Sequence, residues 1–297
     1  NDPLNGVSTF DLVLINKHIL GLEPLNSPYK MIAADANNSR SITTFDIVEL
    51  RKLILGIYTE LPNNTSWRFV DADFGFPNQQ NPFQTIFPET KQIQDLATDH
   101  LAEHFVAVKV GDVNGTAVAN NLVSVDDRRA GTLLFDLQER RVKAGETFTL
   151  RFRAAERALG YQFTLLFPNL EVVDVQPGEA MTLANFGIFN SEHALTTSFD
   201  NEQVTASFDV SFRAKAAGDL SNMLTVSGRI TKAEAYNLSR ERQAVALRFN
   251  GTAGPVIAQQ GFELYQNTPN PWTTRTQIGF YLPEASEATL TVFDETG

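Results

Sequence analysis

Apolar side chains recur at helical spacing in two short segments near the start of the chain, and a glycine ends each segment. The first set is Val13, Leu14, Ile19 and Leu20 before Gly21, and the second is Val48, Leu50, Leu53 and Ile54 before Gly56. This spacing predicts two helices, each stopped by its glycine. Thr43 or Thr44 can cap the second helix. In the linker between them, Pro24 and Pro28 should break regular structure.

Between residues 119 and 250 the pattern changes to an alternation of apolar and polar residues. Phe148, Leu150 and Phe152 share one face, whereas Tyr161, Phe163, Leu165 and Phe167 share another with Gln162 and Thr164 opposite. Further strand candidates are residues 171–175, 204–212, 224–230 and 244–249. Many short strands with regular turns predict an all-β sandwich.

A segment at residues 9–21 returns at residues 44–56, with eight of 13 positions identical. The loop before the second copy has side chains with oxygen atoms at alternating positions. Positions 1, 3, 5, 7, 9 and 12 of this loop are Asp35, Asn37, Ser39, Ser41, Thr43 and Asp46. Calcium takes six to eight oxygen ligands, and a 12-residue loop supplies them at these positions, position 7 through its backbone carbonyl. We therefore expect Ca²⁺ in this loop.

The loop before the first copy is less complete. Counting back from Asp11 at position 12 assigns Ser8 to position 9, Gly6 to position 7 and Asp2 to position 3. Leu4 at position 5 has no side-chain oxygen, and Asn5 can replace it after a local shift. Position 1 falls before residue 1, so we expect the chain to begin inside the loop. The alternative is a plain Asn-Gly turn that leads into the helix.

The repeated loop–helix unit, with Asp instead of Glu at position 12, resembles a type I dockerin module. The resemblance implies a cohesin-type partner, in cis or in trans. In dockerin families the partner is contacted from the end of the loop and the start of the helix, which here means Thr9 and Phe10, and Thr44 and Phe45. Family members usually carry small hydroxyl residues at both spots, so the phenylalanines put exchangeable cohesin binding in doubt. Docking within the chain, as a rigid stalk, is the alternative.

Residues 61–110 are rich in proline, asparagine and aromatic residues, which is too apolar for a disordered linker. We expect an ordered, loop-rich flap packed on the helix pair and ending in an apolar strand at residues 105–110. Residues 111–115, Gly-Asp-Val-Asn-Gly, resemble the opening of another dockerin-type loop. Because no helix follows, a simple turn is the favoured interpretation over a third calcium site.

Two further resemblances concern the second half of the chain. The segments 142–150, 160–163 and 170–175 resemble a cohesin-type jelly roll, an outline that carbohydrate-binding modules share. Residues 265–271, Tyr-Gln-Asn-Thr-Pro-Asn-Pro, and the strands expected after them resemble the type A C-terminal sorting domain of the Bacteroidota type IX secretion system. The family pattern continues beyond residue 297, so we expect only the start of a second small β-sandwich.

Composition excludes several kinds of function. A formal net charge of −11 argues against nucleic-acid binding, which needs a basic face. The absence of cysteine excludes disulfides, thiol nucleophiles and cysteine-based zinc sites. No apolar run is long enough to span a membrane. No nucleophile motif or phosphate loop is present, so we expect no enzyme activity.

These observations predict a multidomain chain. Residues 1–118 form the dockerin-like helix pair with its flap, 119–253 the cohesin-like sandwich, 254–260 a linker and 261–297 the sorting region. We expect a calcium-stabilised, non-enzymatic interaction and secretion-targeting region of a large, adhesin-like protein. That protein would be secreted or anchored at the outer cell surface, and residues 261–297 would engage the type IX machinery. The alternative is a carbohydrate-binding accessory region of an extracellular glycoside hydrolase, which requires a row of exposed aromatic residues on the sandwich.

Overall fold

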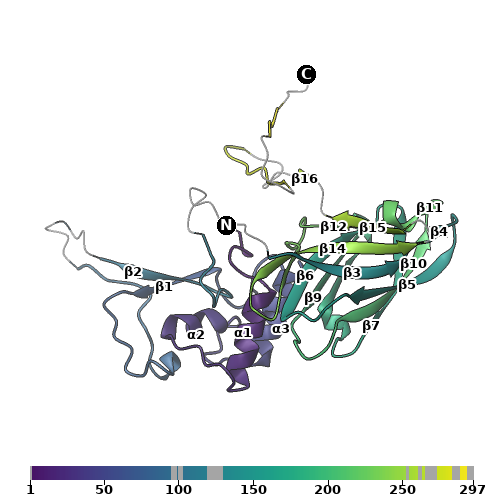
Figure 1. The fold of residues 1–297 in the computed structure, drawn as a ribbon. Helices are drawn as coiled ribbons and strands as arrows, with labels where there is room; N and C mark the ends of the chain where they lie inside the picture. Colours follow the sequence, from purple (N-terminus) through teal and green to yellow (C-terminus); the bar gives the residue numbers. More distant parts are fainter. Residues whose placement is uncertain are drawn as a thin grey trace.

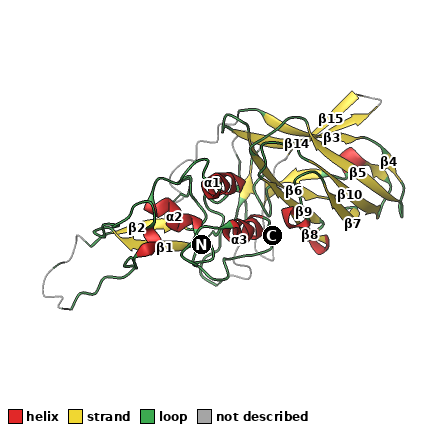
Figure 2. Ribbon diagram, turned by 90° about the horizontal axis from the view of Figure 1, so that it is seen from below, coloured by secondary structure: helices red, strands yellow, loops and turns green. Residues whose placement is uncertain are grey.

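The computed structural model describes residues 2–94, 99, 103–118, 130–251, 254–259, 263–264, 273–282 and 288–292. In this part of the chain, three helices lie between a two-stranded sheet and a β-sandwich (Figure 1). The view from below shows the same order, with α1 and α3 beside strands β6 and β9 of the sandwich (Figure 2). We call residues 2–118 the helical module.

Helices α1 (Thr9–Ile19) and α3 (Thr44–Ile54) are the two that the repeat predicts, and both begin in the same way. Ser8 caps α1 and Thr43 caps α3, and in each case an aspartate three residues later accepts a hydrogen bond from the capping residue's backbone. This reciprocal arrangement satisfies amide groups that a helix start otherwise leaves unpaired. Both helices end before a glycine with positive φ, as expected.

The linker between the repeats is more ordered than its prolines predict. It contains a short helix, α2 (Pro28–Ala34), whose first residue is Pro28. Proline has no amide hydrogen and its φ is fixed near the helical value, so it suits the first position of a helix. The expectation that Pro28 breaks regular structure was therefore wrong.

The flap after α3 packs on the helices, as its aromatic content predicts. Strand β2 (Phe105–Lys109) pairs with β1 (Trp67–Asp71) in an antiparallel sheet. Tyr29 of α2 contacts the ring of Phe76 edge-on, and Phe87 is buried in the same hydrophobic core as Leu50 of α3. The described part of the flap and the helices therefore share one core.

The sandwich has two layers. One layer runs in the order β7-β10-β5-β3-β14-β15, and the other contains β8, β9 and β6, with β13 and β12 on the free edge of β6. Among the described strand pairs of the sandwich, β3 and β14 are parallel and the others are antiparallel. The first layer comprises β3 (Thr132–Gln138), β5 (Thr147–Ala154), β7 (Leu170–Pro177), β10 (Ser207–Ala214), β14 (Arg242–Gly251) and β15 (Gly254–Gln259). The second comprises β6 (Gly160–Leu166), β8 (Phe186–Phe189), β9 (Ala194–Phe199), β12 (Thr225–Ser227) and β13 (Glu234–Tyr236).

Strand β14 belongs to both layers. Its first two residues pair with β13, and the remainder pairs with β3 and β15. A second short pair, β4 (Arg141–Val142) with β11 (Gly218–Asp219), lies at one end. The core between the layers is mainly phenylalanine and leucine, with Phe135, Phe163 and Phe208 among its fully buried side chains.

Strands β6 and β9 differ from the other strands in what covers their outer face. Along β5, buried and exposed residues alternate regularly, as in a sheet with one face in water. Every residue of β9, and every residue of β6 except the last, is buried. Helix α1 packs on the outer face of β6, so this part of the sandwich has a hydrophobic core on one side and the helical module on the other.

Residues 254–259 are not the linker that we expected. They form β15, which pairs with β14 from Ala246↔Gln259 to Gly251↔Gly254. In the sorting region the described residues include a short antiparallel pair, β16 (Glu263–Leu264) with β17 (Phe280–Tyr281). The motif at residues 265–271 lies outside the described residues, so the second sandwich stays a prediction. No helix among the described residues is long and apolar enough to cross a membrane.

Candidate functional site

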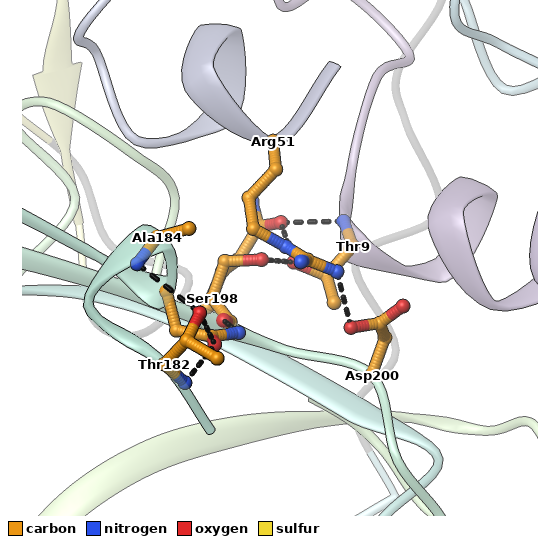
Figure 3. A network of polar contacts seen from close by, with 8 residues as sticks. Thr9, Arg51, Thr182, Ala184, Ser198 and Asp200 are labelled. Atoms are coloured by element: carbon orange, nitrogen blue, oxygen red, sulfur yellow. Dashed lines mark hydrogen bonds and ion pairs between the residues drawn. The ribbon is translucent and has the colours of Figure 1, made fainter. Parts of the chain in front are cut away.

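The first residue of α1 is held by two side chains of the sandwich. The backbone N–H of Thr9 donates to Gln162 Oε1 at 2.6 Å, and its Oγ1 lies 2.8 Å from the same oxygen. Thr9 Oγ1 also lies 2.8 Å from Ser198 Oγ (Figure 3). Thr9, Gln162 and Ser198 are all buried. An amide at a helix start needs an acceptor, and Gln162 supplies one from the other module.

The register of the sandwich positions these partners. Gln162 of β6 is directly opposite Ser198 of β9, and alternation turns both away from the core that contains Tyr161 and Phe199. The Nε2 group of Gln162 donates to Thr231 Oγ1 at 3.1 Å, so both ends of this buried amide have a partner. A buried polar group without a partner costs about 1–3 kcal/mol. The network is therefore specific for the docked arrangement.

The end of α3 is held by the same face. Thr196 Oγ1 donates to the carbonyl of Leu55, the C-cap residue, at 2.7 Å. This bond satisfies one of the carbonyls that a helix end leaves free. Gly187 on β8 allows the approach, because a Cβ atom there would lie 2.5 Å from Thr196 Oγ1 and 3.0 Å from the Leu55 carbonyl oxygen.

A small apolar cluster surrounds the polar contacts. The ring of Phe10 stacks on Tyr236 with centroids 4.8 Å apart, and Val13 and Leu159 pack beside them. The Tyr236 hydroxyl group lies 3.2 Å from Ser8 Oγ and 2.9 Å from Glu234 Oε1. Such a stacked aromatic pair contributes about 0.5–1.5 kcal/mol beyond the area it buries.

Ion pairs between described residues also join the modules. Arg51 of α3 is 2.5 Å from Asp200, and both side chains are more than four-fifths buried. Lys17 pairs with Glu202 at 3.3 Å, and the guanidinium of Arg240 makes two hydrogen bonds to Glu23. The exposed pairs contribute little to stability. Their main effect is to favour one orientation of the two modules.

The two predicted partner contacts have different surroundings. Thr9 and Phe10 contact the sandwich directly, whereas Thr44 is exposed and the Phe45 side chain is 61% exposed. The sandwich residues that contact the module were not predicted from the sequence. One signal was present: the run Thr196-Thr197-Ser198 places hydroxyl groups on both sides of a strand inside an apolar domain.

The loop at residues 35–46 has the arrangement that its donor pattern predicts. Both carboxylates are fully buried. Asp35 accepts hydrogen bonds from the backbone N–H groups of Ser39 and Arg40, each at 2.8 Å. Asp46 accepts from the backbone N–H groups of Asn37 at 3.2 Å and Thr43 at 2.8 Å. The loop therefore folds around its two carboxylates.

The donor set of this loop fits a hard cation. Burial, and to a smaller extent the Asp46 carboxylate, raises the pKa of Asp35. A divalent cation between the Asp35 and Asp46 carboxylates would offset the repulsion between their negative charges. No group of three or more His, Cys, Asp or Glu side chains in the described chain forms a metal cluster, so two carboxylates would act with neutral oxygens. The remaining donors would be Asn37, Ser39, Thr43 and the Ser41 carbonyl, which are oxygen ligands of the type calcium prefers.

The residues predicted for the first loop divide into two groups. Ser8 and Asp11 are buried and form the capping box of α1. Burial, and then the neighbouring Asp112 carboxylate, raises the pKa of Asp11 to about 7. Asp2 is exposed and its Oδ1 accepts from the backbone N–H of Leu4. The side-chain amide of Asn5 bonds to the backbone N–H and carbonyl of Val118 through both its oxygen and its nitrogen.

Comparisons with known proteins concern the sandwich. No family model and no curated protein matches this chain. A chain in the crystal structure of a type I cohesin–dockerin complex from Clostridium thermocellum matches with a TM-score of 0.31 and 6% identity, over 43% of this chain and 99% of that chain. A non-cellulosomal cohesin from Archaeoglobus fulgidus matches with a TM-score of 0.28 and 19% identity, over 40% and 88%. A type II cohesin from Bacteroides cellulosolvens matches with a TM-score of 0.30 and 12% identity, over 44% and 99%.

Proposed function

We propose that this chain is a non-enzymatic, calcium-stabilised interaction region in which the helical module docks on the sandwich of the same chain. The observation that carries this proposal is the burial of Thr9 between Gln162 and Ser198, with its amide and hydroxyl groups both hydrogen-bonded. The first repeat of the dockerin-like pair would thus make its contact in cis, with the cohesin-like sandwich of the same chain. Docking joins the two modules into one rigid unit.

The same contacts limit binding in trans. The face of β6 and β9 is already covered, so a second helical module can reach it only when the first has left. A cohesin-type partner in trans would instead meet Thr44 and Phe45, which are exposed at the start of α3. We therefore place the partner of the first repeat in cis and keep a partner in trans for the second repeat.

Docking can be tested by placing a charge in the interface. Ser198→Arg should separate the modules, because the guanidinium would be buried against α1 when docked and solvated when apart. The chain has no cysteine, so spin labels at Leu22→Cys and Val173→Cys, both exposed, report one distance. We expect a narrow distance distribution in the parent chain and a broad, longer one in the variant.

The matched control is Ser211→Arg. Ser211 lies on β10, where its hydroxyl faces Thr149 on an exposed surface of the other layer. It receives the same charge on a strand that none of the described helices covers, so its distance distribution should equal that of the parent. An unchanged, narrow distribution in Ser198→Arg would show that this face does not hold the modules together.

Glycan binding receives no support from the sandwich surface. Its two tyrosines, Tyr161 and Tyr236, are buried, and residues 130–251 contain no tryptophan. Among the described residues of the sandwich, the large exposed apolar side chains are aliphatic: Val173, Leu183, Ile188, Leu238, Val256 and Ile257. Stacking on sugar rings needs exposed aromatic faces. The protein-interaction proposal is therefore preferred.

We further propose that residues 261–297 direct export by a type IX system, which would place the protein outside the cell or on its outer surface. The support is the motif at residues 265–271. Deleting residues 261–297 in a bacterium with this machinery should leave the protein in the periplasm. Fractionation with a specific antibody would measure this, and undiminished export of the deleted form would contradict the proposal.

A further inference from the structure

The turn after β2 folds against the first residues of the chain. Asp112 is buried, and its carboxylate accepts from the backbone N–H groups of Gly115 at 2.7 Å, Thr116 at 3.1 Å and Ala117 at 2.7 Å. The buried Asp11 carboxylate accepts from the backbone N–H groups of Val113 and Asn114 at 2.9 and 3.3 Å. Two segments about a hundred residues apart therefore share one pair of carboxylates.

The first half of this arrangement matches the first half of the loop at residues 35–46. Asp35 accepts from the amides four and five residues later, and Asp112 does the same. Two residues after each aspartate, an asparagine accepts from the amide two residues further on, at 3.0 Å for Asn37 and 3.1 Å for Asn114. Residues 112–117 thus follow the course of residues 35–40.

The second half matches residues 6–11 with residues 41–46. Asp46 accepts from the amide and hydroxyl of Thr43, and Asp11 accepts from the amide and hydroxyl of Ser8. Each of these aspartates also accepts a hydrogen bond from the backbone N–H of the asparagine in the first half, Asp46 from Asn37 and Asp11 from Asn114.

The two halves are joined as they are in the continuous loop. Ser39 Oγ lies 3.3 Å from the Ser41 carbonyl, and Thr116 Oγ1 lies 3.1 Å from the Gly6 carbonyl. In the continuous loop, residues 40 and 41 are bonded to each other. Here the corresponding residues are Ala117 and Gly6, and a Cβ on Gly6 would lie 2.5 Å from Ala117 N. The two hydrogen bonds between the Asn5 side chain and Val118 hold this break closed.

We propose that residues 112–116 and 6–11 together form a second calcium site, built from two distant segments of the chain. Its side-chain ligands would be Asp112, Asn114, Thr116, Ser8 and Asp11, and its carbonyl ligand Gly6. The set repeats the donor types of the loop at residues 35–46, so the inference rests on the calcium binding proposed for that loop. The turn at residues 111–115 is thus the missing half of the first loop and not a third site.

This site links calcium to docking. Ser8 is both a ligand in this proposal and the group that lies within hydrogen-bonding distance of the Tyr236 hydroxyl. The next residue, Thr9, makes the buried contacts with Gln162 and Ser198. An ion that fixes Ser8 and Asp11 therefore also fixes the start of α1 where it meets the sandwich.

Calorimetric titration of the chelator-treated full chain with calcium tests the proposal. The parent chain should bind two ions. Asp112→Asn keeps the size of the side chain but removes a charged ligand of the discontinuous site. We expect its affinity for calcium at that site to fall about a hundredfold or more, so that only the loop at residues 35–46 still binds an ion tightly. Asn114→Ala, which changes one neutral ligand, should weaken the same site about tenfold. The matched control is Asp2→Asn, an exposed carboxylate in the same region that should leave both sites unchanged.

Asp35→Asn separates the two proposals, because it should remove the other ion. If the parent chain binds one ion, and this ion is lost in Asp35→Asn but kept in Asp112→Asn, the proposal of a discontinuous site is overturned and that of the loop at residues 35–46 is not. Loss of an ion in Asp2→Asn but not in Asp112→Asn would also overturn it, in favour of a continuous first loop. Binding of one ion that depends on Asp112 alone would support the discontinuous site and contradict calcium binding by the loop at residues 35–46.

The far-UV circular dichroism of each calcium-loaded variant shows whether its helices are folded. If Asp112→Asn is unfolded, Asn114→Ala is used in its place, and an unchanged affinity of that variant for calcium would overturn the discontinuous site.

Discussion

Chelation of calcium is expected to lower the unfolding free energy of the helical module by about 8 kcal/mol when both sites are filled. A ligand that binds only the folded state stabilises it by about 4 kcal/mol at a free concentration a thousandfold above its dissociation constant, and two independent sites double this effect. The physical reason is that Asp11, Asp35, Asp46 and Asp112 are buried in pairs, so the folded state without the ion contains repelling carboxylates. Thermal unfolding in calcium and in excess EGTA measures the difference.

The control for this experiment is the variant that carries both Asp35→Asn and Asp112→Asn, whose unfolding midpoint should not respond to calcium. Magnesium makes a second control, since it prefers a smaller octahedral site and should stabilise the parent chain less. Equal midpoints of the parent chain in calcium and in EGTA would mean that both loops are ordinary turns.

Replacing Phe135 with alanine should lower the unfolding free energy of the sandwich by about 3–5 kcal/mol, the usual loss for a buried phenylalanine. Phe135 is fully buried on β3, with ring centroids 5.0 Å from Tyr161, 5.2 Å from Phe163 and 6.2 Å from Phe208. Its removal leaves a cavity that these rings cannot fill without leaving their own contacts. Urea unfolding followed by tyrosine fluorescence would report the shift in midpoint.

Phe45→Ala is the matched control, because this ring is exposed and its loss should change the unfolding free energy by less than about 0.5 kcal/mol. Equal losses for the two phenylalanines would mean that the β3 face does not form the centre of the core.

Local patterns predicted much of the fold. The repeat at residues 9–21 and 44–56 located α1 and α3, because helix caps and terminal glycines are encoded within a few residues. The alternation of apolar and polar residues located β5 and β6, because this pattern too is encoded within a few consecutive residues. Strand β9 was missed, since it is buried on both faces and has no alternation to detect. The prolines at 24 and 28 were interpreted as breaks, although Pro28 starts a helix.

The candidate sites show where such patterns stop being informative. Alternation turned Gln162 away from the core, but nothing local to β6 could indicate that α1 covers it, because that contact spans 153 residues. The donor spacing of residues 35–46 is continuous and therefore visible in the sequence. The other site that we propose is not continuous, because its first half follows its second by about a hundred residues. Counting back from Asp11 therefore assigned position 3 to Asp2, where the proposed site has Asn114, and could not reach Asp112 at position 1.

The pairing of Asn5 with Val118 also determines how the helical module would carry a mechanical load. The chain enters and leaves the module at neighbouring points, so a pull on its two ends acts first on the Asn5–Val118 hydrogen bonds and on the groups around Asp11 and Asp112. Helices α1 and α3 would feel little tension until that junction opens. We expect the force at which the module extends in a single-molecule experiment to depend on calcium at this junction, and much less on the length or composition of the flap.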